Sequence, residues 1–206
     1  MRDDLSAAIG RHQAAFGLEL TESQISRLGD YYELVQEHNP LLHLVAPCSA
    51  EEFAVRHILE SLTLLEFLPE AARFADVGTG AGLPSIPCLI VRENVSAVLI
   101  ESKEKKTGFL EGAATRLGLS DRARVINKQF EEVRDVEFSL ITCRALDRFV
   151  EKLPRIVKWA NGKPMLLFGG PALAEALRRQ KLKFGEKLMP MSERRYLFVI
   201  DGRSAQ

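Results

Sequence analysis

The sequence predicts an α/β fold with a mostly parallel sheet, an antiparallel edge hairpin and an N-terminal helical layer. Three observations predict it. Residues 1–70 carry amphipathic helical runs without strand alternation, whereas residues 71–206 alternate between short apolar strands and helices, which is typical of a parallel sheet with covering helices. The third observation is Phe74–Pro84, where an apolar run ends in three alternate glycines. We therefore expect a helical extension over 1–70, packed on a sheet domain over 71–206.

The N-terminal helices are predicted from two capping boxes, the T-x-x-Q of residues 21–24 and the S-x-x-E of residues 49–52. Each box opens an amphipathic run, and the second run extends to about residue 68. Between the two runs, residues 38–45 are predicted to form a loop, because Pro40 lies within them and a proline disrupts a helix interior.

The predicted strands are short and apolar, and helices separate most of them. The strands cover 74–77, 97–101, 124–127, 138–142, 165–168, 183–189 and 195–201. The helices cover 84–91, 105–117, 148–159 and 172–180. Because no helix is expected between the last two strands, they are predicted to form an antiparallel hairpin at one edge of the sheet.

The composition excludes several classes of protein. No apolar run approaches the roughly 20 residues of a membrane span, and the charged start Met1–Asp4 leads into no signal-peptide core. The three cysteines are scattered without metal-ligand spacing, so we expect buried thiols in a reducing cytoplasm and no metal site. The formal net charge is zero, so a nucleic-acid partner has to be held by local patches. We expect a cytoplasmic monomer that binds no membrane.

The glycine-rich segment is the first candidate ligand site. Gly78, Gly80 and Gly82 follow a strand and precede a helix, so bare backbone can approach a ligand there. A dinucleotide fingerprint requires a small residue where Leu83 stands. Asp76 precedes the glycines, and its carboxylate would repel a pyrophosphate but suit a ligand with a cationic end, such as the ammonium and sulfonium of S-adenosylmethionine.

Further candidates follow the other predicted strands, because ligands of open α/β sheets sit outside the carboxyl ends of the strands. Glu101 ends the second strand, where an acid can grip two ribose hydroxyls. Phe130 and Glu131 follow the third strand and are candidates to bracket an adenine. Arg144 follows the fourth strand and can fork to a carboxylate or a phosphate, or form a salt bridge to a neighbouring helix.

His57 is a weaker candidate for a general base, since a histidine on such a helix more often packs or caps. Lys103, Lys105 and Lys106 stand beside the predicted pocket and are candidates for phosphate contacts, although a solvated helix face has the same pattern. The sequence contains no Ser-His-Asp order, no paired-carboxylate motif and no P-loop.

Four segments together resemble the bacterial small-subunit (16S) ribosomal RNA guanine-N7 methyltransferases, the RsmG or GidB type. The most specific is the glycine loop continued into Leu-Pro-x-Ile-Pro, at Asp76–Pro87. The others are Val55–Ser61, the acid and lysine-rich helix start at Glu101–Leu110, and Cys143–Ala145, which is similar to the family's Ser-Arg-Ala. The resemblance implies a Rossmann-like S-adenosylmethionine-dependent methyltransferase sheet and small-subunit ribosomal RNA, or an assembling ribosomal particle, as the partner.

The resemblance also implies residue roles. Gly78 and Leu83 would line the cofactor, and Glu101 would bind its ribose. Phe130 and Glu131 would flank the adenine. Arg144, the one catalytic candidate, would sit between the cofactor and the RNA.

This sequence departs from the family pattern in two places. The family loop Asn-Lys-x-x-Asn-Leu-Thr is replaced by Asn39–Val45, which reads Asn-Pro-Leu-Leu-His-Leu-Val. The Lys-Gly that ends the fifth strand is replaced by Gly169–Gly170. Both changes remove polar or basic groups near the expected RNA face.

Guanine N7 attacks through a lone pair and has no proton to lose, so its methylation requires no general base. The absence of an obvious base in the sequence agrees with this chemistry. Catalysis is then expected from proximity and alignment, with Arg144 in a positioning role.

Three alternatives remain open at this point. One is a methyltransferase of the same fold that acts on a small molecule or a protein, which the neutral charge favours. Another is a nicotinamide oxidoreductase, against which Asp76 and Leu83 weigh. The third is a non-catalytic, ribosome-associated module that binds the cofactor, which the missing lysine at Gly169 supports.

Overall fold

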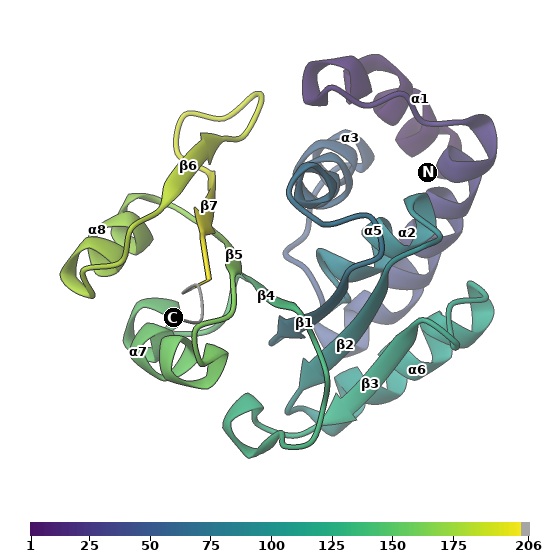
Figure 1. Cartoon of the computed structure of the whole chain (residues 1–206). Coiled ribbons are helices and arrows are strands. Elements are labelled where there is room, and N and C mark those ends of the chain that lie inside the picture. Colours follow the sequence, from purple (N-terminus) through teal and green to yellow (C-terminus); the bar gives the residue numbers. More distant parts are fainter. Residues whose placement is uncertain (203–206) are drawn as a thin grey trace.

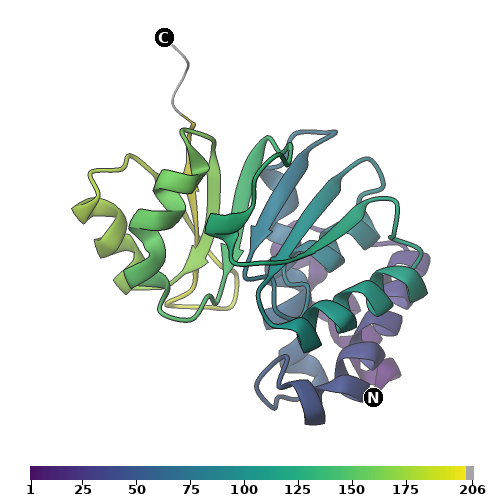
Figure 2. The same ribbon diagram turned by 90° about the horizontal axis from the view of Figure 1, so that it is seen from below.

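The computed structural model describes residues 1–202 and contains a seven-stranded sheet in the order β3-β2-β1-β4-β5-β7-β6 (Figures 1 and 2). The strands are β1 (Arg73–Val77), β2 (Ser96–Glu101), β3 (Ala123–Asn127), β4 (Leu140–Arg144), β5 (Met165–Gly169), β6 (Gly185–Leu188) and β7 (Tyr196–Ile200). Strands β1 to β5 are parallel, and β7 runs antiparallel between β5 and β6. The predicted fold class, including the edge hairpin, is confirmed.

Helices cover both faces of the sheet (Figure 1). One face packs against the N-terminal layer and two later helices, namely α1 (Arg2–His12), η1 (Gln13–Phe16), α2 (Glu22–Leu42), α5 (Ser85–Val91) and α6 (Glu104–Arg116). The other face packs against η4 (Phe130–Glu132), α7 (Phe149–Ala160) and α8 (Pro171–Arg179). The N-terminal helices share one continuous hydrophobic core with the sheet, and the division at residue 70 stays a prediction.

The loop predicted over residues 38–45 is wrong, because α2 continues through Pro40 to Leu42. Pro40 lies in the last turn, so the helix loses a single hydrogen bond near an end that is already short of partners. The helix stops at His43, whose backbone is left-handed with φ 48°. The Asn39 side chain then accepts a hydrogen bond from the Val45 N–H at 3.0 Å, which holds the chain after the helix.

The run predicted over residues 49–68 is continuous but not uniformly α-helical. It comprises α3 (Ala50–Phe53), the π-helical turn η2 (Ala54–Leu59), α4 (Glu60–Leu62) and the 3-10 turn η3 (Thr63–Glu66). A π turn widens a helix locally and re-aims the side chains that it carries. Here it carries Arg56 and His57.

The fourth strand begins two residues later than predicted, at Leu140 instead of Phe138, and it includes Arg144. Phe138 stays outside the sheet because its ring stacks on Trp159 of α7, with centroids 4.9 Å apart. The last residue of the strand, Arg144, is paired with Phe168 of β5. Both faces of β4 are buried, since its first four residues are buried and only Arg144 is partly exposed.

The chain reverses its winding direction between β1 and β4, which lie side by side in the sheet. In open α/β sheets ligands bind at this switch point, outside the carboxyl ends of the strands. Within residues 1–202, no helix has the length and apolar character needed to cross a bilayer, and no three acidic, histidine or cysteine side chains are grouped to hold a metal.

Core packing on α2 generates a first prediction. Leu28 is fully buried, whereas Leu41 on the same helix is 76% exposed. Leu28→Ala leaves a cavity and should lower the free energy of unfolding by about 2–5 kcal/mol. Leu41→Ala is the matched control and should change it by less than about 0.5 kcal/mol. Urea denaturation of both variants measures this, and equal losses would contradict the assignment of α2 to the core.

Candidate functional site

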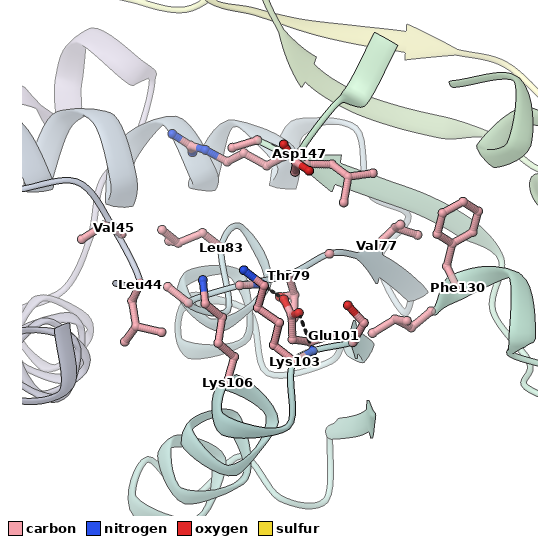
Figure 3. Close-up of a pocket in the computed structure, with 18 of the residues that line it drawn as sticks. Leu44, Val45, Val77, Thr79, Leu83, Glu101, Lys103, Lys106, Phe130 and Asp147 are labelled. Atoms are coloured by element: carbon pink, nitrogen blue, oxygen red, sulfur yellow. Dashed lines mark hydrogen bonds between the residues drawn. The ribbon is translucent and has the colours of Figure 1, made fainter. Parts of the chain in front are cut away.

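A pocket of about 540 Å³ opens at the carboxyl ends of β1, β2 and β4. In Figure 3, Leu44 and Val45 stand at one end of it and Phe130 at the other. Glu101 and the lysines of the α6 start lie along one side, and Asp147 lies across from them. The pocket therefore sits at the switch point of the sheet, where the sequence placed the ligand.

The structure brings most of the predicted site residues together. Those that line the pocket are Gly78, Gly80, Leu83, Glu101, Phe130 and Arg144. Those that do not line it are Asp76, Gly82 and Glu131. Whether any of them binds a ligand stays a prediction.

The glycine loop needs its glycines for different reasons. Gly78, Gly80 and Gly82 all have left-handed φ angles, of 67°, 58° and 90°. A Cβ on Gly78 or Gly82 would lie 2.4 Å from a neighbouring side chain, whereas a Cβ on Gly80 would meet nothing closer than 3.9 Å. Gly80 therefore leaves space on the pocket side, where a ligand can approach the backbone.

Asp76 lies beneath the glycine loop instead of facing the pocket. It is completely buried, and its Oδ2 accepts hydrogen bonds from Thr79 Oγ1 at 2.7 Å and from Ser85 Oγ at 2.6 Å. Its Oδ1 has no partner within residues 1–202. Burial raises the pKa of Asp76 to about 7, and the two hydroxyl donors only partly oppose this shift. The carboxyl group thus ties the end of β1 to the loop and to the start of α5.

Glu101 joins the two loops that form one wall of the pocket (Figure 3). Its Oε2 accepts a hydrogen bond from the Gly80 N–H at 3.1 Å, and its Oε1 accepts one from the Lys103 N–H at 2.9 Å. Each carboxylate oxygen keeps a further lone pair. The group is therefore fixed in place and can still accept hydrogen bonds from two hydroxyls.

Arg144 is held by the N-terminal helical layer. Its guanidinium donates to Ser61 Oγ at 3.1 Å, to Glu60 Oε2 at 3.2 Å and to the Arg56 carbonyl. Glu60 is buried and also accepts from Arg195 Nε at 2.5 Å. The salt bridge to a neighbouring helix, one of the alternatives read from the sequence, is present, and the side chain still lines the pocket.

His57 reaches the pocket from the π turn. Burial and three neighbouring arginines lower its pKa to about 3, so the imidazole is neutral at physiological pH. Its Nδ1 is buried without a partner within residues 1–202, and its ring lies 5.0 Å from that of Phe53. A group with this pKa is a poor general base at neutral pH.

Phe130 and Glu131 separate in the structure. The Phe130 ring is buried and lines the pocket. Glu131 pairs with Arg155 of α7 at 2.9 Å, outside the pocket.

Cys143 is buried, and burial raises the pKa of its thiol well above the ordinary value. It is therefore an inert core thiol.

Two segments of the pocket wall were missed by the sequence analysis. The first is Leu44–Ala46, after α2, and the second is Leu146–Asp147, after β4. The departure from the family pattern at Asn39–Val45 is the one signal that marks the first segment. In it, Pro40 and Val45 stand where the family has a lysine and a threonine, and Val45 forms an apolar end of the pocket together with Leu44, which matches the family's leucine.

A sheet of this order, with a glycine loop at its switch point and an acid at the end of the next strand, defines a Rossmann-like methyltransferase. A solved structure with this fold is Pyrococcus horikoshii TYW2 in complex with MeSAdo, at TM-score 0.58 and 15% identity, with 72% of this chain and 63% of that chain covered. This likeness concerns the fold alone.

The sequence itself matches the family described as rRNA small subunit methyltransferase G over residues 24–191. The protein of that name from Neisseria meningitidis serogroup C is 40% identical over 148 residues, which cover 72% of this chain and 69% of the relative. That from Sorangium cellulosum is 36% identical over 186 residues, which cover 83% and 77%. The chain belongs to this family, and it is a methyltransferase; the resemblance read from the sequence is confirmed.

The buried carboxyl group of Asp76 generates a second prediction. Its ordinary pKa is 3.8 and its folded pKa is about 7, so the folded state binds the proton more tightly and stability is lost as pH rises from about 4 to 7. Asp76→Asn keeps an uncharged acceptor. Between pH 5 and pH 8, the free energy of unfolding of this variant should therefore rise relative to that of the wild type by on the order of 2 kcal/mol.

Urea denaturation at the two pH values measures this gain. Asp121→Asn, at an exposed position, is the control and should stay within about 0.5 kcal/mol of the wild type at both. A stability difference between Asp76→Asn and the wild type that is the same at pH 5 and pH 8 would show that Asp76 is ionised in the fold throughout this range.

Proposed function

We propose that the protein transfers the methyl group of S-adenosylmethionine to N7 of a guanine in small-subunit ribosomal RNA. The observation that carries the proposal is the single pocket that unites the open backbone at Gly80, the fixed carboxylate of Glu101 and the apolar wall of Phe130. The open backbone at Gly80 suits the amino acid part of that cofactor, the Glu101 carboxylate suits its ribose, and the Phe130 wall suits its adenine. Membership of the rRNA small subunit methyltransferase G family supports the RNA substrate.

The pocket residues fit this cofactor. Glu101 would accept hydrogen bonds from the ribose hydroxyls, since its oxygens keep lone pairs beyond the Gly80 and Lys103 contacts. Phe130 would cover the adenine, and the loop around Gly78 and Gly80 would hold the methionine end. When bound, the cofactor supplies an electrophilic methyl group. Asp76 would act by shaping the loop, because its carboxyl group lies outside the pocket.

The neutral His57 in the pocket wall suits a nucleophile that loses no proton. The site lacks a basic histidine at neutral pH, since His57 has a pKa of about 3. A neutral His57 also does not oppose the positive charge that develops on the purine. Arg144, held by Glu60 and Ser61, would position the RNA or the cofactor carboxylate, and alignment would supply the rate enhancement.

Membership of a methyltransferase family removes the nicotinamide oxidoreductase alternative. The direct test of the proposal is incubation of the purified protein with methyl-labelled S-adenosylmethionine and either bare small-subunit RNA or the assembled particle. Mass spectrometry should locate the label on N7 of one guanine in at least one of these substrates. Label on neither RNA, or on another atom, would contradict the proposal.

Loss of the Glu101 charge generates a third prediction. Glu101→Gln keeps the shape but loses the charge of an acceptor whose hydrogen bonds contribute roughly 1.5–3 kcal/mol each. Calorimetry should therefore show at least about tenfold weaker binding of S-adenosylmethionine. Glu104→Gln, at an exposed position at the start of α6, is the matched control. Affinity within twofold of the wild type would place Glu101 away from the ribose.

A fourth prediction concerns Arg144. Arg144→Ala removes the guanidinium, with its paired N–H donors, and should slow single-turnover methylation on the order of a hundredfold. The loss should depend little on pH between about 6 and 9, because no group titrates in the transfer step. Arg144→Lys should rescue poorly, since a point charge does not reproduce the fork.

Because Arg144→Ala also leaves buried Glu60 with one partner fewer, a melting curve must show that the variant is folded at the assay temperature. Full activity of the alanine variant would make Arg144 a structural ion-pair partner only. A steep pH dependence of the chemical step that persists in Asp76→Asn, which lacks the carboxyl group with a pKa of about 7, would mean that a proton is removed and that N7 is the wrong acceptor.

A further inference from the structure

A second hollow lies on the α7 face of the sheet, and the proposed reaction does not use it. This groove, of about 560 Å³, runs between α7 and the connection that leads from η4 to β4. Two aromatic rings line it, Phe138 and Trp159, which stack with an interplanar angle of 26° and are both half-buried. The Trp159 indole N–H donates to the Val133 carbonyl at 3.4 Å, which fixes the ring in the groove wall.

The groove is basic although the whole chain is neutral. Four basic side chains line it, Arg134, Arg155, Lys158 and Lys163, against two acids, Glu131 and Asp135. Arg155 is paired with Glu131 at 2.9 Å, and the Arg134 guanidinium bonds to backbone carbonyls of its own loop. The Lys158 side chain is exposed, and its ammonium makes no ion pair or hydrogen bond within residues 1–202, so it is available to an anion.

The groove adjoins the pocket along α7. Lys152 lines the pocket, and Arg155 and Trp159 line the groove. The spacing of three and then four residues places them on one face of the helix. Inside the fold, Phe130 lines the pocket and meets Trp159 edge-on, with centroids 5.8 Å apart. A chain that enters the pocket can therefore continue along α7 into the groove.

We propose that this groove binds single-stranded RNA next to the target nucleotide, with an unstacked base against Trp159 and Phe138 and the adjoining phosphates against Lys158 and Arg155. Aromatic rings beside cations are the combination that binds single-stranded nucleic acid without reading its sequence. The two rings already stack on each other, and Lys163 Nζ lies 5.3 Å from the Phe138 centroid; a base would pack against this ring pair, whereas an acidic peptide would use the cations alone. The proposal rests on the proposed function only in taking RNA as the substrate. The groove would be the local basic patch that a chain of zero net charge needs in order to bind RNA.

The lone tryptophan makes the proposal directly testable, because Trp159 is the chain's one tryptophan. A mixed-sequence, single-stranded oligoribonucleotide of about ten nucleotides, titrated into the protein saturated with S-adenosylhomocysteine, should quench the emission. Binding seen by anisotropy of a labelled oligonucleotide without quenching would overturn the proposal, as would the absence of binding. Stronger quenching by polyglutamate than by RNA would assign the groove to an acidic protein and also overturn it.

Variants separate stacking from charge. Trp159→Leu should lower the affinity for the labelled oligonucleotide on the order of tenfold, and Trp159→Phe should retain part of that affinity. Lys158→Glu should reduce the slope of log affinity against log salt by at least about 0.7. Arg11→Glu is the matched control, since Arg11 is exposed on α1, which packs on the opposite face of the sheet (Figure 1). Melting curves exclude unfolding, and wild-type behaviour of both Lys158→Glu and Trp159→Leu would overturn the proposal.

The same preparation distinguishes this proposal from the proposed function. If small-subunit RNA is methylated while the oligonucleotide leaves Trp159 unchanged, the groove assignment fails and the methylation stands. If the oligonucleotide quenches Trp159 and no guanine is methylated, the groove assignment stands and the methylation fails.

Discussion

The buried carboxyl group of Asp76 is the constraint on which the site depends. It receives two hydroxyl donors, from Thr79 in the loop and Ser85 at the start of α5, so one group connects strand, loop and helix. The loop conformation then presents the Gly80 N–H to Glu101. A buried acid is unfavourable when it is charged, and here its hydrogen bonds shape the loop that forms the pocket.

A second buried carboxylate connects the helical layer to the sheet. Glu60 accepts from Arg144 at the end of β4 and from Arg195 just before β7. Removing one partner of such a buried pair is strongly destabilising, because it leaves charge without compensation. The N-terminal helices therefore hold a side chain of the pocket in place.

Much of the fold could be predicted because its signals are local. These signals are the alternation of apolar runs and helices, the glycine loop, and the acids or arginines at strand ends. Each depends on residues close in sequence, and together they predicted the sheet and most of the pocket. One failure is local, because a proline in the last turn of a helix is tolerated, and the other involves a contact between residues distant in sequence. Pro40 did not end α2 at the predicted position, and Phe138 left the fourth strand to stack on Trp159 of α7.

The sequence by itself determined the α/β class, the family and the place of the pocket, since the three glycines adopt left-handed φ angles and the strand-end acid accepts from the Gly80 N–H within one short loop. The tertiary structure alone decided which candidates face the pocket. Asp76 lies beneath the loop, Glu131 pairs with Arg155 outside the pocket, and Leu44 and Val45 line the pocket. The physical reason is that the direction of a side chain depends on partners such as Glu60 for Arg144, 84 residues away in the chain.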